Sequence, residues 1–191
     1  GSGMSAARVL VPEGMDPRHA QRTLDLIAGH EGALHRIEAA LAHEKESTAP
    51  ATAAMLAALD AKWRSLEEDY GVYEAAEVAT LLGVTNRSSV HRLRETRGLV
   101  AYKRANRRLY PAFQFQRDKA LDMRPLTTPL RAAGWSDEDI VMWLISANGY
   151  TPGHEPPVVA LVEAVERTDS GVAQVPPQLA DLAAAAAAPA W

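Results

Sequence analysis

The segment from Val72 to Gln116 constrains the fold most, because it combines two short helical patterns with two apolar strand patterns. Apolar residues recur at helical spacing from Glu74 to Leu82, and Gly83 follows, where a left-handed backbone costs glycine little. Thr85 or Asn86 can then cap a second helix through a side-chain oxygen. The pattern predicts a helix-turn-helix, with an ordinary helical hairpin as the alternative.

The second helix is expected from Arg87 to Arg97, with Val90 and Leu93 facing inward and Gly98 ending it. Short hydroxyl side chains near its start let the backbone approach a duplex closely. Arginines on the same helix bond guanine edges or phosphates. The candidate DNA-binding residues of this helix are Arg87, Ser88, Ser89, His91, Arg92 and Arg94.

A hairpin is expected next, with strands beginning at Leu99–Tyr102 and Leu109–Phe113 and with Asn106 able to take a positive φ in the turn. The candidate DNA-binding residues of the hairpin are Lys103, Arg104, Arg107 and Arg108. Between Arg87 and Arg108 there are eight Lys or Arg against one acid, a net charge of +7. The whole chain carries −4, so the remainder carries −11. Such a charge separation is typical of a surface that binds a polyanion.

The order of residues from Gly98 to Tyr110 resembles the wing of the MerR and excisionase families. It contains a Gly-Leu pair, basic residues and an Arg-x-Tyr triplet that ends in Tyr110. This resemblance implies a winged helix-turn-helix over residues 71–118 that holds double-stranded DNA.

The first part of the chain is expected to serve assembly. Gly-Ser-Gly-Met looks like an expression scar, so residues 1–15 are interpreted as a tag and flexible start. Residues 16–70 are expected to form a helical hairpin, with a linker at Ser47–Pro50 and a second apolar stripe made of Met55, Leu59, Trp63, Leu66 and Tyr70. Packing on the winged unit of the same chain and homodimerisation are both open. We favour a homodimer, because small DNA-binding domains commonly gain affinity by pairing two recognition helices about 34 Å apart.

Composition and motifs argue against several other classes of function. The chain has no cysteine, which excludes disulfides and cysteine-ligated zinc. His30, Glu31 and His35 form HExxxH, whose longer spacing turns the two imidazoles to different helix faces, so no metal site is expected. We expect no catalytic residue, no cofactor and no enzyme, because no P-loop, GxSxG or GxGxxG motif occurs. No run reaches the roughly 18 apolar residues that cross a membrane, and a bacterial cytoplasmic protein with no membrane partner is expected.

The segment from Leu130 to Leu161 predicts short helices. Gly134 ends one helix, and Ser136 caps the next, which has three acids in its first turn. Its expected buried face is Ile140, Trp143 and Leu144. Pro156-Pro157 starts a further helix that runs from Val158 to about Arg167.

The order Trp143-Leu144, Asn148, Gly153, Pro156 or Pro157 and Leu161 resembles the C-terminal toxin-binding domain of the Xre/MbcA/ParS antitoxin family. The resemblance implies that residues 119–168 form a small helical partner-binding domain with a protein toxin as the partner. The candidate partner-binding residues are Trp143, Asn148, Tyr150 and Gly153, with core packing as the alternative for Trp143. In the tail, residues 169–191, a helix from Leu179 to Ala188 is expected only against a neighbour, and a flexible or self-docked tail is expected.

The sequence as a whole predicts a mainly α chain: a helical hairpin, a winged helix-turn-helix with a small β-hairpin, and a small helical domain. The expected function is a sequence-specific DNA-binding regulator of transcription or an autoregulating antitoxin. The alternative is a protein-interaction module that binds a partner through its basic face and helical domain without reading DNA.

Overall fold

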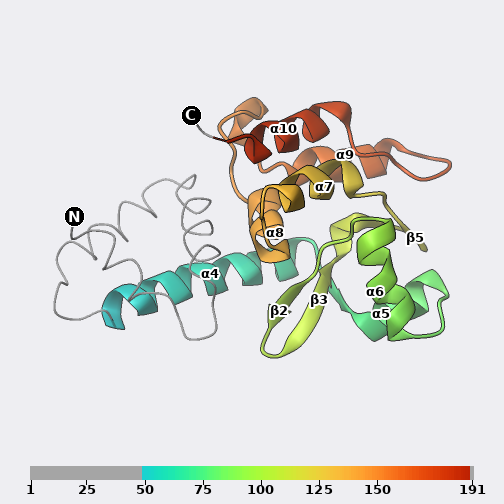
Figure 1. Cartoon of the computed structure of the whole chain (residues 1–191), viewed down its shortest axis with the longest axis horizontal. Coiled ribbons are helices and arrows are strands. Elements are labelled where there is room, and N and C mark those ends of the chain that lie inside the picture. The colour runs from blue at the N-terminus through green and yellow to red at the C-terminus, as the bar shows by residue number, and fades with distance from the viewer. Residues whose placement is uncertain (1–48, 190–191) are drawn as a thin grey trace. The chain divides into compact units, whose positions relative to one another are not determined.

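The computed structural model describes residues 49–189, and the chain divides into two compact units, Gly1–Ser65 and Leu66–Trp191. The described part holds seven helices and five short strands (Figure 1), so the mainly α prediction is confirmed. The predicted first helix of the hairpin and the HExxxH segment at residues 30–35 lie outside the described residues. Homodimerisation through the hairpin stays a prediction.

Helix α4, Ala49–Asp69, corresponds to the predicted second helix of the hairpin. Pro50 fits its first turn, where the missing N–H has no partner to lose. Met55, Leu59 and Leu66 of the predicted stripe are buried, while Trp63 is half-buried.

The helix-turn-helix consists of α5, Ala75–Leu82, and α6, Arg87–Thr96. Gly83 between them has a φ of 68°, as the turn requires. Two wing strands follow, β2 at Tyr102–Arg104 and β3 at Arg107–Pro111. A strand that the sequence did not reveal, β1 at Val72–Glu74, pairs antiparallel with β3, which gives the sheet order β1-β3-β2. The wing therefore rests on a three-stranded sheet rather than on an isolated hairpin.

The first wing strand begins later than Leu99, where we expected it, because a buried glutamine takes over the pairing of Val100. Gln114 Oε1 accepts from Val100 N at 2.9 Å and Gln114 Nε2 donates to Val100 O at 2.7 Å. Gln114 belongs to the short helix η1, Ala112–Gln114, which leads into the strand pair β4, Phe115–Gln116, and β5, Lys119–Ala120. The fully buried Gln114 amide thus satisfies the backbone N–H and C=O of Val100, which a neighbouring strand would otherwise pair with.

The remaining elements are helical. They are α7 at Arg124–Ala132, α8 at Asp137–Ile145, η2 at Pro152–His154, α9 at Val158–Arg167 and α10 at Pro177–Ala187. Ser136 caps α8 as predicted, with a capping box to Asp139. The predicted face of α8 is buried, and so are its other residues apart from Glu138, because the helix contacts both α7 and β2.

The tail docks on the helical part of the same unit. Helix α10 packs against α7 (Figure 1), with Leu179 and Ala183 buried, which matches the self-docked alternative. The winged helix-turn-helix and the helices after it share one compact unit, so the predicted boundary near residue 118 does not separate two independent bodies.

Gly98, which follows α6, lies close against the first turns of α7. Its φ is +62°, and a Cβ there would meet Thr127 Oγ1 and approach Arg124 N to 2.9 Å. We expect Gly98→Ala to lower the free energy of unfolding by about 3 kcal/mol through backbone strain and overpacking together. Urea unfolding measures it.

Gly83 supplies the matched control, because its φ is +68° but nothing lies within 4 Å of a Cβ there. Gly83→Ala is expected to cost only the strain of the left-handed backbone, about 1 kcal/mol. Equal losses for the two variants would contradict the close packing at Gly98.

Candidate nucleic-acid interface

Helix α6 presents polar side chains outward because its cap and one buried valine fix its rotation. Asn86, one of the two predicted caps, accepts from Ser89 N at 2.9 Å and from Ser89 Oγ at 3.1 Å. Val90 is fully buried, and Arg87, Ser88, His91 and Arg92 are exposed. The hydroxyl of Ser89 is therefore engaged in the cap, while Arg87, Ser88, His91 and Arg92 face solvent.

The wing turns through two residues in the left-handed region. Ala105 has a φ of 49° and Asn106 a φ of 63°, the pattern of a type I′ turn, and Arg104 pairs with Arg107 across it. The prediction that Asn106 takes a positive φ is confirmed.

The pleat of the wing divides its four cations between two faces. Lys103 lies opposite Arg108 and Arg104 opposite Arg107, so each pair shares one face of the sheet. Arg108 Nη1 lies 3.1 Å from His91 Nδ1, which places the Lys103–Arg108 face toward α6. Arg104 instead pairs with Glu67 at 2.9 Å, and Arg107 pairs with Glu74 at 2.8 Å.

Glu67, near the end of α4, contacts two residues on the other face of β2, Tyr102 and Arg104. Its carboxylate accepts from the Tyr102 hydroxyl at 3.3 Å as well as pairing with Arg104. Burial and then the Glu67 charge raise the pKa of Tyr102, so the hydroxyl stays protonated and donates. Arg104 is thus held against the protein, and we withdraw it from the predicted DNA-binding residues.

A groove of about 410 Å³ lies where α5, α6 and the wing meet. Its lining residues are Glu74, Ala75, Ala76, Arg87, His91, Asn106, Arg107, Arg108 and Tyr110. A guanidinium only donates, so in this contact His91 Nδ1 is the acceptor of the Arg108 hydrogen bond. Three arginines and a histidine of the predicted set therefore gather at one concave surface, with Glu74 as its one acid.

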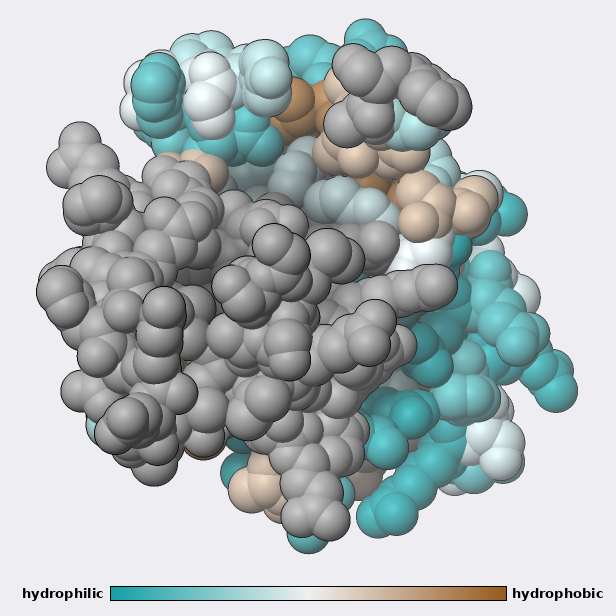
Figure 2. Space-filling view, turned by 60° about the vertical axis from the view of Figure 1, so that its left-hand side comes forward, coloured by the Kyte–Doolittle hydropathy of each residue, from teal (hydrophilic) through white to brown (hydrophobic). Residues whose placement is uncertain are grey.

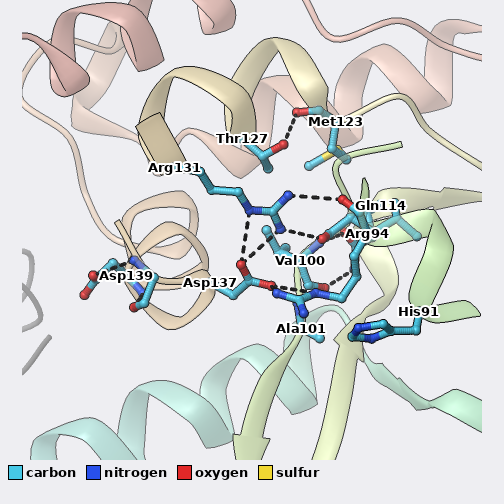
Figure 3. A network of polar contacts seen from close by, with 12 residues as sticks. His91, Arg94, Val100, Ala101, Gln114, Met123, Thr127, Arg131, Asp137 and Asp139 are labelled. Carbon is cyan, nitrogen blue, oxygen red and sulfur yellow. Dashed lines mark hydrogen bonds and ion pairs between the residues drawn. The ribbon is translucent and has the colours of Figure 1, made fainter. Parts of the chain in front are cut away.

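Arg94 does not reach this groove. Its Nη2 lies 2.6 Å and its Nε 3.1 Å from Asp137 Oδ2, and its side chain is 26% exposed (Figure 3). The prediction that Arg94 contacts DNA does not fit this internal ion pair, because a phosphate would have to displace a buried carboxylate.

The partner-binding residues predicted from the antitoxin resemblance divide in the same way. Trp143 is 5% exposed and stacks edge-on with Trp135 at a ring-centroid distance of 6.4 Å, so the core alternative describes it. Asn148 and Gly153 shape a loop, since Asn148 Oδ1 accepts from Tyr150 N at 2.9 Å and Gly153 has a φ of 64°. Tyr150 is 91% exposed.

A second groove, of about 300 Å³, lies beside Tyr150 between the loop, α9 and α10. Its lining residues are Tyr150, Thr151, Pro152, Glu155, Pro156, Pro157, Ala160, Glu163, Gln178, Leu179 and Leu182. Among the coloured residues in Figure 2, hydrophobic ones reach the surface mainly in a small area level with α9 and α10, and most of the other coloured residues are hydrophilic.

Sequence reasoning missed the acids and amides that hold the interface. Asp137 was expected only as a first-turn acid of α8, and Arg131, Glu67 and Gln114 were given no role. Apart from the Arg131–Asp137 pair, which is six residues apart, their partners lie 14 or more residues away along the chain, at distances that helix periodicity does not report. Only the excess of acids outside the basic segment hinted at such pairs.

Within residues 49–189, no cluster of three His, Asp or Glu side chains is placed to hold a metal ion. None of the helices in this described part is long and apolar enough to cross a membrane. Comparison with protein-family models, with curated proteins and with solved structures gives no match for this chain.

The turn of the wing is suboptimal at Ala105, because a left-handed backbone suits Asn or Gly better than Ala. We expect Ala105→Asn to raise the free energy of unfolding by about 0.5–1 kcal/mol, measured by urea denaturation. Ala105→Val, which puts a β-branched residue at the same φ, is expected to lower it. If both variants unfolded at the midpoint of the unaltered chain, the turn would not be of this type.

Proposed function

We propose that this chain binds double-stranded DNA through α6 and the wing. The observation that carries the proposal is the groove in which Arg87 and His91 of α6 lie beside Arg107 and Arg108 of the wing. A ten-residue helix is about 15 Å long and has the width that a major groove admits. The first turns of α6 would enter the major groove, where Ser88 and His91 would face the bases and Arg87 and Arg92 the flanking phosphates.

Electrostatics favours the same surface. In the part of the chain that the structure describes, Arg87, Arg92 and Lys103 make no ion pair, and Arg108 contacts the His91 ring and the Tyr110 hydroxyl rather than a carboxylate. These four cations are available to phosphates, and each neutralised phosphate releases counterions. Arg107 is 65% exposed and could exchange Glu74 for a phosphate at little cost, because an exposed ion pair stabilises weakly.

A regulator of transcription is the role that such a reader supports best. Homodimerisation through residues 16–70, and the narrower role of an autoregulating antitoxin with a toxin partner, extend this proposal. They rest on the sequence patterns and the family resemblance described above.

A salt titration tests DNA binding. With four phosphate contacts, a plot of the logarithm of the association constant against the logarithm of the salt concentration should have a slope of about −3.6. Each contact contributes about −0.9 to this slope. Fluorescence anisotropy with a labelled random-sequence duplex measures this slope. We expect Arg87→Gln combined with Arg108→Gln to reduce its magnitude by about 2 and to weaken binding more than tenfold at about 0.1 M salt.

Arg167→Gln, an exposed position in the last turn of α9, is the matched control and is expected to leave the slope unchanged. Two results would overturn the proposal. One is a chain that binds no duplex at low salt. The other is an unaltered slope in the double variant.

A protein-interaction module is the second candidate, and Tyr150 is the observation that favours it. The loop from Asn148 to Glu155 is closed by its own hydrogen bonds. Asn148 N donates to His154 O at 3.1 Å, and Thr151 Oγ1 donates to Asn148 O at 2.9 Å. A rigid loop that presents an exposed aromatic ring beside an apolar groove loses little entropy when a partner covers it.

Tyr150→Ala separates the two candidates. Because the ring is 91% exposed, we expect its loss to change the free energy of unfolding by less than about 0.5 kcal/mol and to leave duplex binding unchanged. Purification from the native host with nuclease present is the measurement. A partner held by the groove stays with the unaltered chain and is lost from the variant.

Val172→Ala is the control, since Val172 is an exposed apolar residue that does not line the groove. A partner retained equally by both variants would argue against this groove, and one lost from every chain on nuclease treatment would favour DNA as the link.

A further inference from the structure

One buried carboxylate joins three parts of the DNA-binding unit. Asp137 is 8% exposed, and its Oδ2 accepts from Arg94 of α6 and from Ala101 N at 3.1 Å, just before the wing (Figure 3). Its Oδ1 accepts from Arg131 of α7, from Nε at 3.2 Å and from Nη2 at 3.0 Å. The last turn of α6, the entry to β2 and α7 therefore meet at a single side chain.

Arg131 closes the same network from the other side. Its Nη1 donates to Arg94 O at 3.2 Å and its Nη2 donates to Leu99 O at 2.8 Å. The carbonyls of a helix's last turn have no partner within the helix, so this guanidinium satisfies one of them and fixes the chain that leaves α6. Asp137 holds Arg131 in place for both bonds.

The network lies where α6 and the wing diverge. Arg87 and His91 are on the first two turns of α6, and Arg108 is on β3, whereas Arg94 and Ala101 lie between them along the chain. A rotation of α6 relative to the wing would separate the side chains that line the groove, and it would also stretch the hydrogen bonds to Asp137.

We propose that Asp137 is a positioning residue of the DNA-binding surface, and that Arg94 acts through it without touching DNA. This inference rests on the proposed function. Asp137 would hold the helix and the wing at one relative angle, so that both meet the same duplex. Sequence discrimination depends on that angle, because a side chain must meet a base edge in close hydrogen-bonding geometry. Contacts with phosphates, which carry no sequence information, depend on the angle much less.

Asp137 and a DNA phosphate would compete as partners of Arg94. Asp137 accepts five N–H bonds, four of them from guanidiniums, in a site with little solvent. Removing one partner of such a pair leaves a buried charge poorly compensated, whereas a surface contact with a phosphate competes with water and salt. Arg94 therefore stays with Asp137 when DNA binds.

The test compares Arg94→Gln, Asp137→Asn and the double variant on two duplexes, one of random sequence and one selected from a randomised pool by the unaltered chain. Positioning predicts that each single variant loses about tenfold or more of its preference for the selected duplex. It also predicts that the salt slope stays unchanged and that the double variant is no worse than the poorer single. Glu166→Gln, exposed on α9, controls for the change of charge.

Two outcomes overturn the inference while DNA binding stands. In the first, Arg94→Gln lowers the salt slope by about one, as the loss of a phosphate contact would. In the second, both duplexes weaken together in proportion to the unfolded fraction measured by circular dichroism. If Asp137→Asn does not fold, Arg94→Gln decides alone, because it leaves Asp137 paired with Arg131. Failure of the unaltered chain to bind either duplex would instead remove the proposed function itself.

Discussion

The ion-paired carboxylate of Asp137 is the interaction on which the arrangement of α6, the wing and α7 depends. It lies at the first residue of α8 and receives two guanidiniums that come from α6 and α7. Burial of this carboxylate is tolerable only because both of its oxygens are bonded, and the same bonds fix the end of α6 and the start of the wing. The helices after the wing are thereby joined to α6 and the wing within one compact unit.

The cations of the basic segment fall into two groups: those that form ion pairs with carboxylates of the same chain and those that do not. Of its eight Lys and Arg residues, Arg94, Arg104 and Arg107 pair with Asp137, Glu67 and Glu74. The charge of +7 counted along the sequence therefore overstates what a duplex would meet. The outward cations are fewer, but they lie on adjoining elements, and Arg87 and Arg108 line one groove. Such convergence favours the binding of a polyanion.

Local signals in the sequence predicted the local structure well. The cap at Asn86, the turn at Gly83, the capping box of Ser136 and the positive φ of Asn106 each depend on residues within a few positions, and each is present. The strand β1 and the pairing of Gln114 with Val100 depend on contacts far apart in the chain. The ion pairs of Arg94 and Arg104 could not be predicted for the same reason, since no periodicity shows which carboxylate a guanidinium meets.

The claim that α6 and the wing form one duplex-binding surface is tested most directly by following the arginine Nε–H signals in a ¹⁵N–¹H NMR spectrum as duplex DNA is added. The account predicts that the signals of Arg87 and Arg108 shift, while those of Arg94 and Arg104 stay where they are in the free chain. Shifts of Arg94 and Arg104 with Arg87 and Arg108 unmoved, or no shift of any arginine signal, would contradict it.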